Sequence, residues 1–148
     1  MHTTYLALGS NLGNRRQLMA RAIELIGREV GTVERKSEFY ESEPWGFDSE
    51  NRFLNAVVKV QTELEPMELL RTTQHIERLL GRKHKTATPT GQAGNSNKPV
   101  YHDRTMDIDI LLYDDLSIDE PTLKIPHPLM TERDFVMVPL REVMESKA

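Results

Sequence analysis

The chain has 148 residues and a formal net charge of −4, with 38% hydrophobic and 28% charged residues. This length and composition are typical of one globular domain with a proper core, and the acidic balance without a long basic run argues against nucleic acid as a partner. The absence of cysteine excludes disulfides, zinc–thiolate sites and cysteine nucleophiles. We expect a cytoplasmic protein without membrane contact, since there is neither a signal-peptide pattern nor an apolar run of membrane-spanning length.

The N-terminal segment predicts a strand followed by a helix. The strand covers residues 3–8 and ends in Gly9-Ser-Asn-Leu-Gly-Asn14, a turn-forming cluster. This cluster lacks the Lys-Ser/Thr ending of a phosphate-binding loop, which favours a purely structural turn. The helix covers residues 15–30, with Asn14 or a neighbour as its cap and Gly31 as its stop.

The rest of the chain predicts two more strands, a second helix, a last strand and a tail. Strands are expected over 32–40 and 53–62, and Pro66 opens a helix that runs to residue 80. A last strand covers 104–113. The resulting β-α-β-β-α-β order is the ferredoxin-like α+β fold, an antiparallel sheet with both helices on one face, here with a short C-terminal helical tail. We expect residues 1–148 to form one domain.

The last strand carries two carboxylates on one face. Side chains alternate along a strand, so Asp107 and Asp109 point the same way with Cα atoms about 7 Å apart. The opposite face carries Ile108, Ile110 and Leu112, which we expect to be buried. Hard oxygen ligands at this spacing suit Mg²⁺, which usually brings a phosphate. Alternatively, the pair lies on a solvated sheet face without a ligand.

Basic residues flank a long polar segment. Gly81-Arg-Lys-His-Lys85 closes the second helix, where cations complement the helix dipole, and Arg104 stands just before the two aspartates. Arginine beside metal-binding carboxylates is typical of phosphoryl transfer. Because loops this long are usually disordered segments or active-site lids, we expect residues 84–103 to form a mobile catalytic loop over a polyphosphate.

An aromatic ring and an amide share one face of the strand over 53–62. Phe53 and Asn55 there suit a planar heterocycle, since the ring stacks and the amide reads donor and acceptor edges. An asparagine that faces the core without a ligand would be costly. Trp45 and Phe47 lie in a nearby loop, where they either close over a ligand or pack into the core.

Two further groups of polar residues are ambiguous by themselves. Gln74 and Glu77 share one helix face, where an ordinary solvated pair is the simpler interpretation. His127 stands between two prolines in a rigid turn, where it is either a hydrogen-bonded anchor or, with Arg133, a phosphate contact.

Together these motifs resemble the 6-hydroxymethyl-7,8-dihydropterin pyrophosphokinases of the folate pathway. The resemblance covers nearly the whole chain, and its most specific part is the Arg-Thr-x-Asp-x-Asp strand followed by Pro-His-Pro. The motifs that carry it are Tyr5–Gly13, Glu43–Phe47, Phe53–Val58, Gly81-Arg82, Arg104–Tyr113 and Ile125–Pro128. It implies the ferredoxin-like fold, a requirement for ATP and two Mg²⁺ ions, and transfer of pyrophosphate from ATP to the pterin alcohol with release of AMP. We expect a monomer whose partners are these two small molecules.

The resemblance also implies roles for individual positions. Catalytic roles fall to Arg82, Arg104, Asp107 and Asp109, the two aspartates being the metal ligands as well. Pterin contacts fall to Ser42, Trp45, Phe53, Asn55 and Phe135. ATP contacts fall to Gln74, Glu77, His84, Tyr101, Arg104, Ile110, Lys124, His127 and Arg133.

Some positions depart from the family pattern. Tyr101-His-Asp-Arg104 stands where the family usually carries Trp-Gly-Pro-Arg, and His84 stands where an arginine is common. Tyr101 offers less stacking area, and a phosphate contact by His84 would be weaker and pH-dependent. These differences concern nucleotide contacts and loop closure.

Two alternative functions remain for a ferredoxin-like domain. An RNA-binding module would need aromatics on the central strands and a basic sheet face, neither of which the sequence indicates. A small-molecule-binding regulatory domain would not need two carboxylates beside arginines.

Overall fold

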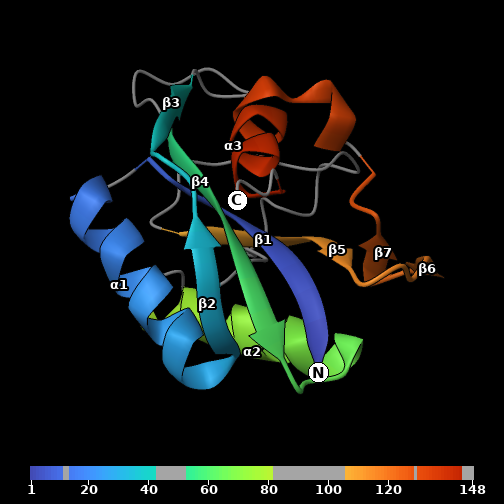
Figure 1. The fold of residues 1–148 in the computed structure, drawn as a ribbon. Coiled ribbons are helices and arrows are strands. Elements are labelled where there is room, and N and C mark those ends of the chain that lie inside the picture. The colour runs from blue at the N-terminus through green and yellow to red at the C-terminus, as the bar shows by residue number, and fades with distance from the viewer. Residues whose placement is uncertain (12–13, 43–52, 82–105, 129, 145–148) are drawn as a thin grey trace, which may run out of the picture.

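An antiparallel sheet forms the centre of the molecule. The computed structural model describes residues 1–11, 14–42, 53–81, 106–128 and 130–144. The sheet has the strand order β2-β4-β1-β5, and a short strand β3 also pairs with β4 (Figure 1). The strands are β1 (His2–Ser10), β2 (Gly31–Lys36), β3 (Tyr40–Ser42), β4 (Phe53–Thr62) and β5 (Asp107–Tyr113). With the two helices between them, the four longer strands follow the predicted β-α-β-β-α-β order, so the ferredoxin-like α+β fold is confirmed.

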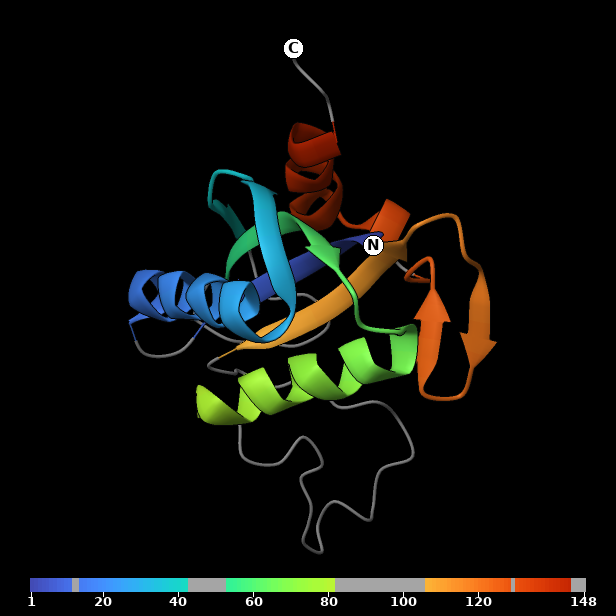
Figure 2. The same ribbon diagram turned by 60° about the horizontal axis from the view of Figure 1, so that its bottom comes forward.

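Helices cover both faces of this sheet. As predicted, α1 (Arg15–Glu29) and α2 (Pro66–Leu79) pack on one face, and α3 (Asp134–Met144) packs on the other (Figure 2). Two separate apolar clusters result. The larger joins α1 and α2 to one side of β1, β4 and β5, and the smaller joins α3 to Ala7, Val57 and Leu111 on the other side.

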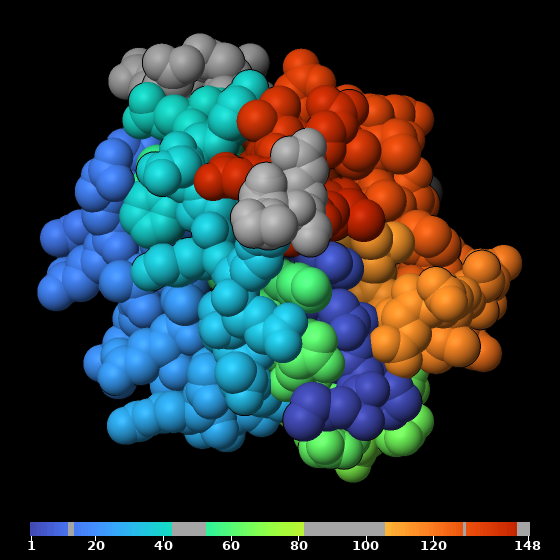
Figure 3. Space-filling view, in the orientation of Figure 1, coloured from blue at the N-terminus to red at the C-terminus, as the bar shows by residue number. Residues whose placement is uncertain are grey.

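The C-terminal part is more than the short tail that the sequence predicts. After β5 the chain forms a two-stranded sheet of β6 (Ile118–Glu120) and β7 (Leu123–Ile125), a 3₁₀ turn η2 (Met130–Glu132) and then α3. On the surface α3 lies beside the segment of β2 and β3 (Figure 3). The Glu142 carboxylate accepts the Glu38 backbone N–H there, at 3.1 and 3.2 Å. Among the described residues no helix has the length and apolarity needed to cross a membrane.

The first helix begins as predicted, but it ends in a different way from the prediction. Asn14 is the predicted cap, and its side-chain oxygen accepts the Gln17 backbone N–H at 3.2 Å. The helix ends at Val30 in an ordinary helical conformation, so the prediction that Gly31 supplies the stop is wrong. Gly31 instead opens β2 at a close approach of two strands, because a Cβ there would lie 2.0 Å from the Gln61 carbonyl oxygen.

The start of α2 also follows the prediction. Pro66 occupies the first turn, where its missing N–H is harmless. Glu65 and Glu68 form a reciprocal capping box around it, with the Glu65 N–H donating to Glu68 Oε1 at 2.9 Å. Gly81, just after the helix, has a positive φ of 106°, the conformation that glycine supplies most easily at a helix end.

The predicted strand over 32–40 is interrupted. Ser37 donates its backbone N–H to the Val57 carbonyl at 2.9 Å, and its hydroxyl accepts the Val57 N–H at 3.0 Å. The serine side chain thus replaces a backbone partner, and the segment divides into β2 and β3. In contrast, the strand predicted over 53–62 is confirmed as β4.

The last strand contains a β-bulge that changes which side chains share a face. Leu6 pairs with Ile110 and Tyr5 with Leu112, so Leu111 is an extra residue in β5. Ile108 and Ile110 are buried under the helices as predicted. Leu112 is only partly buried and packs on the α3 side, so its predicted place beside them is wrong.

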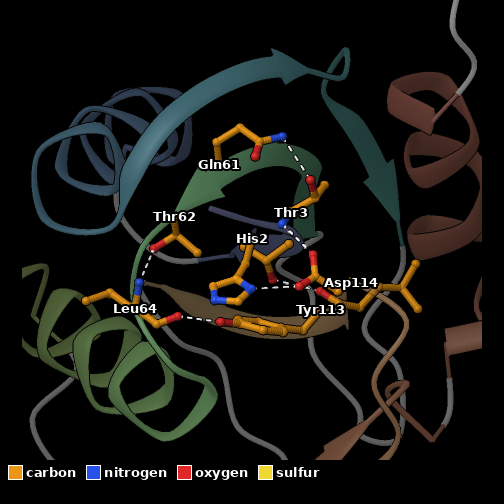
Figure 4. Close-up of polar contacts among 9 residues, drawn as sticks. His2, Thr3, Gln61, Thr62, Leu64, Tyr113 and Asp114 are labelled. Atoms are coloured by element: carbon orange, nitrogen blue, oxygen red, sulfur yellow. Dashed lines mark hydrogen bonds and ion pairs between the residues drawn. The ribbon is translucent and has the colours of Figure 1, made fainter.

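Polar contacts lock the end of the sheet where β1 begins and β5 ends (Figure 4). Asp114 accepts the Thr3 N–H at 2.8 Å and lies 2.7 Å from His2 Nδ1, which lowers the pKa of its carboxyl group. Tyr113 is buried and donates its hydroxyl to the Leu64 carbonyl. Burial, helped by nearby carboxylates, raises the pKa of Tyr113 to about 12.

Candidate active site

A row of four cross-strand neighbours crosses the α3 face at the opposite end of the sheet. Tyr40 pairs with Asn55, Asn55 with Gly9, and Gly9 with Asp107. Directly opposed residues project to the same face, so an amide and a carboxylate stand on either side of a glycine. With strands about 4.8 Å apart, the Cα atoms of Asn55 and Asp107 are about 10 Å apart. Gly9 lies between these two residues and has no side chain.

The glycine in this row keeps the space open. A Cβ at Gly9 would lie 3.3 Å from Asn55 Oδ1 and 3.5 Å from the nearest carbon of the Phe53 ring. Any side chain there would crowd the amide and the ring together. Gly9 thus leaves a position without a side chain that Phe53 and Asn55 border, and this position is the hollow over Gly9.

Internal hydrogen bonds orient the Asn55 amide. Its Nδ2 donates to the Tyr40 carbonyl and to Ser42 Oγ, each at 2.9 Å, and the residue is 5% exposed. The sequence argument that its burial would be costly without a ligand is therefore wrong for the NH₂ group, because the protein satisfies it. Asn55 Oδ1 is the atom next to the space over Gly9, where a ligand N–H would meet an acceptor.

An aromatic side chain and an arginine of the C-terminal part lie at the edge of the same face. Phe135, at the start of α3, packs against the cluster that α3 forms with the sheet. The Arg133 guanidinium lies over its ring, with Cζ 5.7 Å from the ring centroid. The structure thus gives Phe135, predicted for the pterin, and Arg133, predicted for ATP, a direct mutual contact.

The two aspartates lie on this face as predicted. Asp109 pairs with Ala7, and Asp107 pairs with Gly9, so both project to the side of α3. Both are partly exposed. Among the described residues no three His, Asp or Glu side chains converge as a ready-made metal cage. Two carboxylate ligands nevertheless suit Mg²⁺, which usually completes its octahedron with water and substrate phosphates.

His127 stands beside this pair. Its Nε2 lies 4.0 Å from Asp109 Oδ2, and its side chain is 20% exposed. Burial and then the positive charge of Arg133 lower the pKa of His127, while Asp107 acts in the opposite direction. The net shift keeps the imidazole neutral at pH 7.

The remaining ATP-side predictions divide into two groups. On α2, Gln74 is half-buried, whereas Glu77 is 3% exposed and accepts the Ile108 N–H at 2.8 Å through Oε2. The ordinary solvated pair is therefore wrong for Glu77. Lys124 is separate from this group, because its ammonium pairs with Asp119 across the β6–β7 hairpin at 2.7 Å.

Several predicted positions lie outside the described residues. These are Trp45 of the pterin set, Arg82 and Arg104 of the catalytic set, His84 and Tyr101 of the ATP set, and the catalytic loop predicted over 84–103.

Comparison with known proteins assigns the family of this arrangement. A family model described as 7,8-dihydro-6-hydroxymethylpterin-pyrophosphokinase matches residues 5–145. The chain belongs to this family. Among curated members, a 2-amino-4-hydroxy-6-hydroxymethyldihydropteridine pyrophosphokinase of Porphyromonas gingivalis (strain ATCC 33277) is 49% identical over 97% of this chain and 91% of its own length. The enzyme of that name from Aquifex aeolicus is 41% identical over 97% of this chain and 81% of its own.

Solved structures of this family carry the same fold. One is a Plasmodium falciparum HPPK-DHPS triple mutant with STZ-DHP, at a TM-score of 0.71 and 15% identity. The match covers 97% of this chain and 40% of that one, so the chain spans well under half of the solved protein. At this identity the likeness concerns the fold alone.

Sequence reasoning missed two features of this candidate site. Gly9 was interpreted only as a turn residue, and its place between Asn55 and Asp107 emerges once β1 lies between β4 and β5. The contact between Glu77 and the Ile108 amide joins residues 31 apart in the chain. The signal that could have indicated it is a glutamate at a buried helical position, one turn past Thr73.

Proposed function

We propose that this chain transfers pyrophosphate from ATP to 6-hydroxymethyl-7,8-dihydropterin and releases AMP. The observation that carries the proposal is the row of Asn55, Gly9 and Asp107, which joins a planar-ring hollow to a carboxylate pair on one sheet face. Membership of the pyrophosphokinase family supplies the identity of the two substrates.

On the pterin side, the ring lies in the hollow over Gly9. Phe53 and Phe135 offer aromatic surface, and Asn55 Oδ1 accepts a ring or amino N–H. Ser42 acts through Asn55, because its hydroxyl accepts one of the amide hydrogens and fixes the direction of Oδ1. Trp45 completes this set by the family resemblance.

On the nucleotide side, the triphosphate approaches Asp107 and Asp109. These carboxylates would hold two Mg²⁺ ions, which would supply positive charge to offset that of the triphosphate. Neutral His127 lies 4.0 Å from Asp109, and the positive charge of Arg133 acts on His127. Both side chains offer N–H donors to phosphate oxygens. Gln74, Ile110, Lys124, His84 and Tyr101 complete the proposed nucleotide contacts. Glu77 belongs to this set through its hydrogen bond to the Ile108 backbone.

Positioning accounts for most of the chemistry in this proposal. The hydroxymethyl oxygen forms a bond to the β-phosphorus, the bond from that phosphorus to the α-phosphate oxygen breaks, and AMP departs. Arg82 and Arg104 neutralise charge on the migrating group. The proton of the alcohol passes to Asp107 or Asp109, which stand on the same face as the hollow.

We further propose that the chain acts as a cytoplasmic monomer, as one domain, with these two small molecules as its partners. Its net charge of −4 offers no footprint for a nucleic-acid backbone. Residues 84–103 are proposed as the catalytic loop on the grounds of their polarity and basic flanks.

One assay tests the reaction. The protein is incubated with ATP, Mg²⁺ and the hydroxymethyl pterin, and AMP is measured with and without the pterin. The proposal expects AMP only when all three are present, together with the pyrophosphorylated pterin in equal amount. ADP as the product, or no turnover in a folded sample that still binds pterin, would contradict it.

A further inference from the structure

The strand that carries both aspartates lies at the edge of the sheet. Among the described residues β5 pairs with β1 alone, so its other side faces away from the sheet. In an antiparallel pair, alternate residues turn their backbone groups toward and away from the partner strand. The Ile108 amide turns away, since it donates to Glu77, and the amides of Asp107 and Asp109 on either side turn toward β1.

Two groups from other elements hold this outer edge. Glu77 comes from the last turn of α2, and its Oε2 lies 2.8 Å from the Ile108 nitrogen in a buried setting. The His127 backbone N–H donates to the Leu111 carbonyl at 3.1 Å. The edge is therefore held at Ile108 and at Leu111. Asp109 lies between these two residues, and Asp107 directly precedes Ile108.

A glutamate in this place needs an explanation beyond packing. It is 3% exposed on a helix whose other buried positions are Leu69, Thr73 and Ile76. A buried carboxylate is unfavourable unless strong hydrogen bonds compensate, and a charge-assisted bond to a backbone amide is among the strong ones. A leucine would pack as well but would leave the Ile108 amide buried without an acceptor.

We propose that Glu77 is a positioning residue for the cation site. Its carboxylate fixes the Ile108 backbone, and thereby the separation and direction of the Asp107 and Asp109 side chains. The inference rests on the proposed function only in taking these two aspartates as ligands of a divalent cation. Mg²⁺ tolerates little deviation from octahedral geometry, so a strand edge that shifts by a fraction of an ångström weakens its binding.

Three variants separate positioning from direct contact with ATP and from general packing. Glu77→Ala removes the acceptor, whereas Glu77→Gln keeps an oxygen for the Ile108 amide but removes the charge. The matched control is Thr73→Val, one turn earlier on α2, because Thr73 is also buried and its hydroxyl donates to the Leu70 carbonyl of its own helix.

Two measurements that do not depend on turnover carry the test. Mn²⁺ binding in the presence of the non-reactive α,β-methylene analogue of ATP is followed by electron paramagnetic resonance. Hydrogen exchange of the Ile108 amide is followed by nuclear magnetic resonance, with the thermal midpoint as a check of folding. The wild-type AMP assay comes first, so that loss of the proposed function is recognised separately.

We expect Glu77→Ala to weaken Mn²⁺ binding about 10-fold or more, the range for residues that orient metal ligands, and to expose the Ile108 amide to exchange. Glu77→Gln should stay within about threefold of the wild type, because its neutral bond to the amide is weaker but present. Thr73→Val should leave both readouts unchanged.

Three results would overturn the proposal. One is wild-type Mn²⁺ affinity in Glu77→Ala while Ile108 exchanges freely. Another is a loss of Mn²⁺ binding in Glu77→Gln as large as that expected for Glu77→Ala, while the Ile108 amide stays protected from exchange. That result would assign the role to the charge of Glu77. It can be obtained even if the alanine variant does not fold. The third is a loss of Mn²⁺ affinity in Thr73→Val as large as that in Glu77→Ala. That result would show that Glu77 contributes only through the packing of its helix.

Discussion

The two faces of the sheet differ in how completely helices cover them. On the face of α1 and α2, the side chains of Leu54, Ala56, Val58 and Val60 along β4 are all at most 3% exposed. On the other face α3 packs over Val57 and its neighbours. The row from Asn55 through Gly9 to Asp107 lies farther along these strands, where partly exposed carboxylates stand on the sheet.

This difference lets one set of strands serve both stability and the proposed function. Alternation along each strand sends apolar residues to one face and leaves the positions between them for chemistry. The functional face tolerates a glycine, an amide and two carboxylates because the opposite face already buries a large apolar cluster. Substitutions of apolar side chains in the helix-covered cluster should therefore mainly lower the free energy of unfolding, whereas substitutions of the polar residues on the α3 face should mainly affect turnover and binding.

The largest expected effect is on the functional face. Asp109→Ala removes a proposed cation ligand, so we expect kcat to fall by about a thousandfold or more, which corresponds to about 4 kcal/mol in the barrier. The fold should persist, because Asp109 is partly exposed. Steady-state kinetics with the thermal midpoint measure both. Asp115→Ala, an exposed aspartate just past the same strand, is the matched control and should keep normal turnover. Near-normal activity of Asp109→Ala would remove the basis of the cation site.

The helix-covered face should respond in the opposite way. Ile26→Ala on α1 empties a fully buried position, which should lower the free energy of unfolding by about 2–5 kcal/mol. Turnover per folded molecule should not change, since the residue lies in the cluster beneath the sheet. Urea unfolding and kinetics below the transition test this. A specific loss of kcat at full folding would show that the two faces are not separable in this way.

Gly9→Ala should produce a smaller and selective effect. The added methyl would lie 3.3 Å from Asn55 Oδ1, so the amide must shift by a few tenths of an ångström. We expect the KM for the pterin to rise about tenfold, the value of about one disturbed hydrogen bond, with little change in the KM for ATP. Gly27→Ala, where a Cβ meets nothing within 4 Å, is the control and should leave both constants unchanged. Equal effects on both substrates would argue against a pterin hollow over Gly9.

The smallest effect concerns the locked end of the sheet. Since the pKa of Tyr113 is raised from 10.0 to about 12, its neutral form contributes stability that is fully present below pH 10 and is lost as the pH rises toward 12. Absorbance at 295 nm should show one fewer tyrosine ionising near pH 10 in the folded wild type than in the unfolded chain. In Tyr113→Phe the tyrosine ionisation at about pH 12 should be missing. Ionisation of all tyrosines near pH 10 in the folded protein would contradict the burial of this hydroxyl.

The sequence predicted the features of the candidate site that depend on neighbouring residues. It did not predict those that depend on contacts between distant parts of the chain. The alternation of β4 and the Asp-x-Asp pair of β5 lie within single strands, so the side on which Asn55, Asp107 and Asp109 project follows from neighbours in sequence. The bulge at Leu111, the break at Ser37 and the burial of Glu77 depend on partners elsewhere in the chain. No local pattern contains those partners, and the role of Gly9 needed the strand order for the same reason.

The most direct test of the account is a crystal structure of the protein with Mn²⁺, the α,β-methylene analogue of ATP and the hydroxymethyl pterin. We expect the cation at the carboxylates of Asp107 and Asp109, and the pterin ring over Gly9 with a nitrogen on Asn55 Oδ1. A cation held away from these two carboxylates, or a ring bound elsewhere than over Gly9, would contradict it.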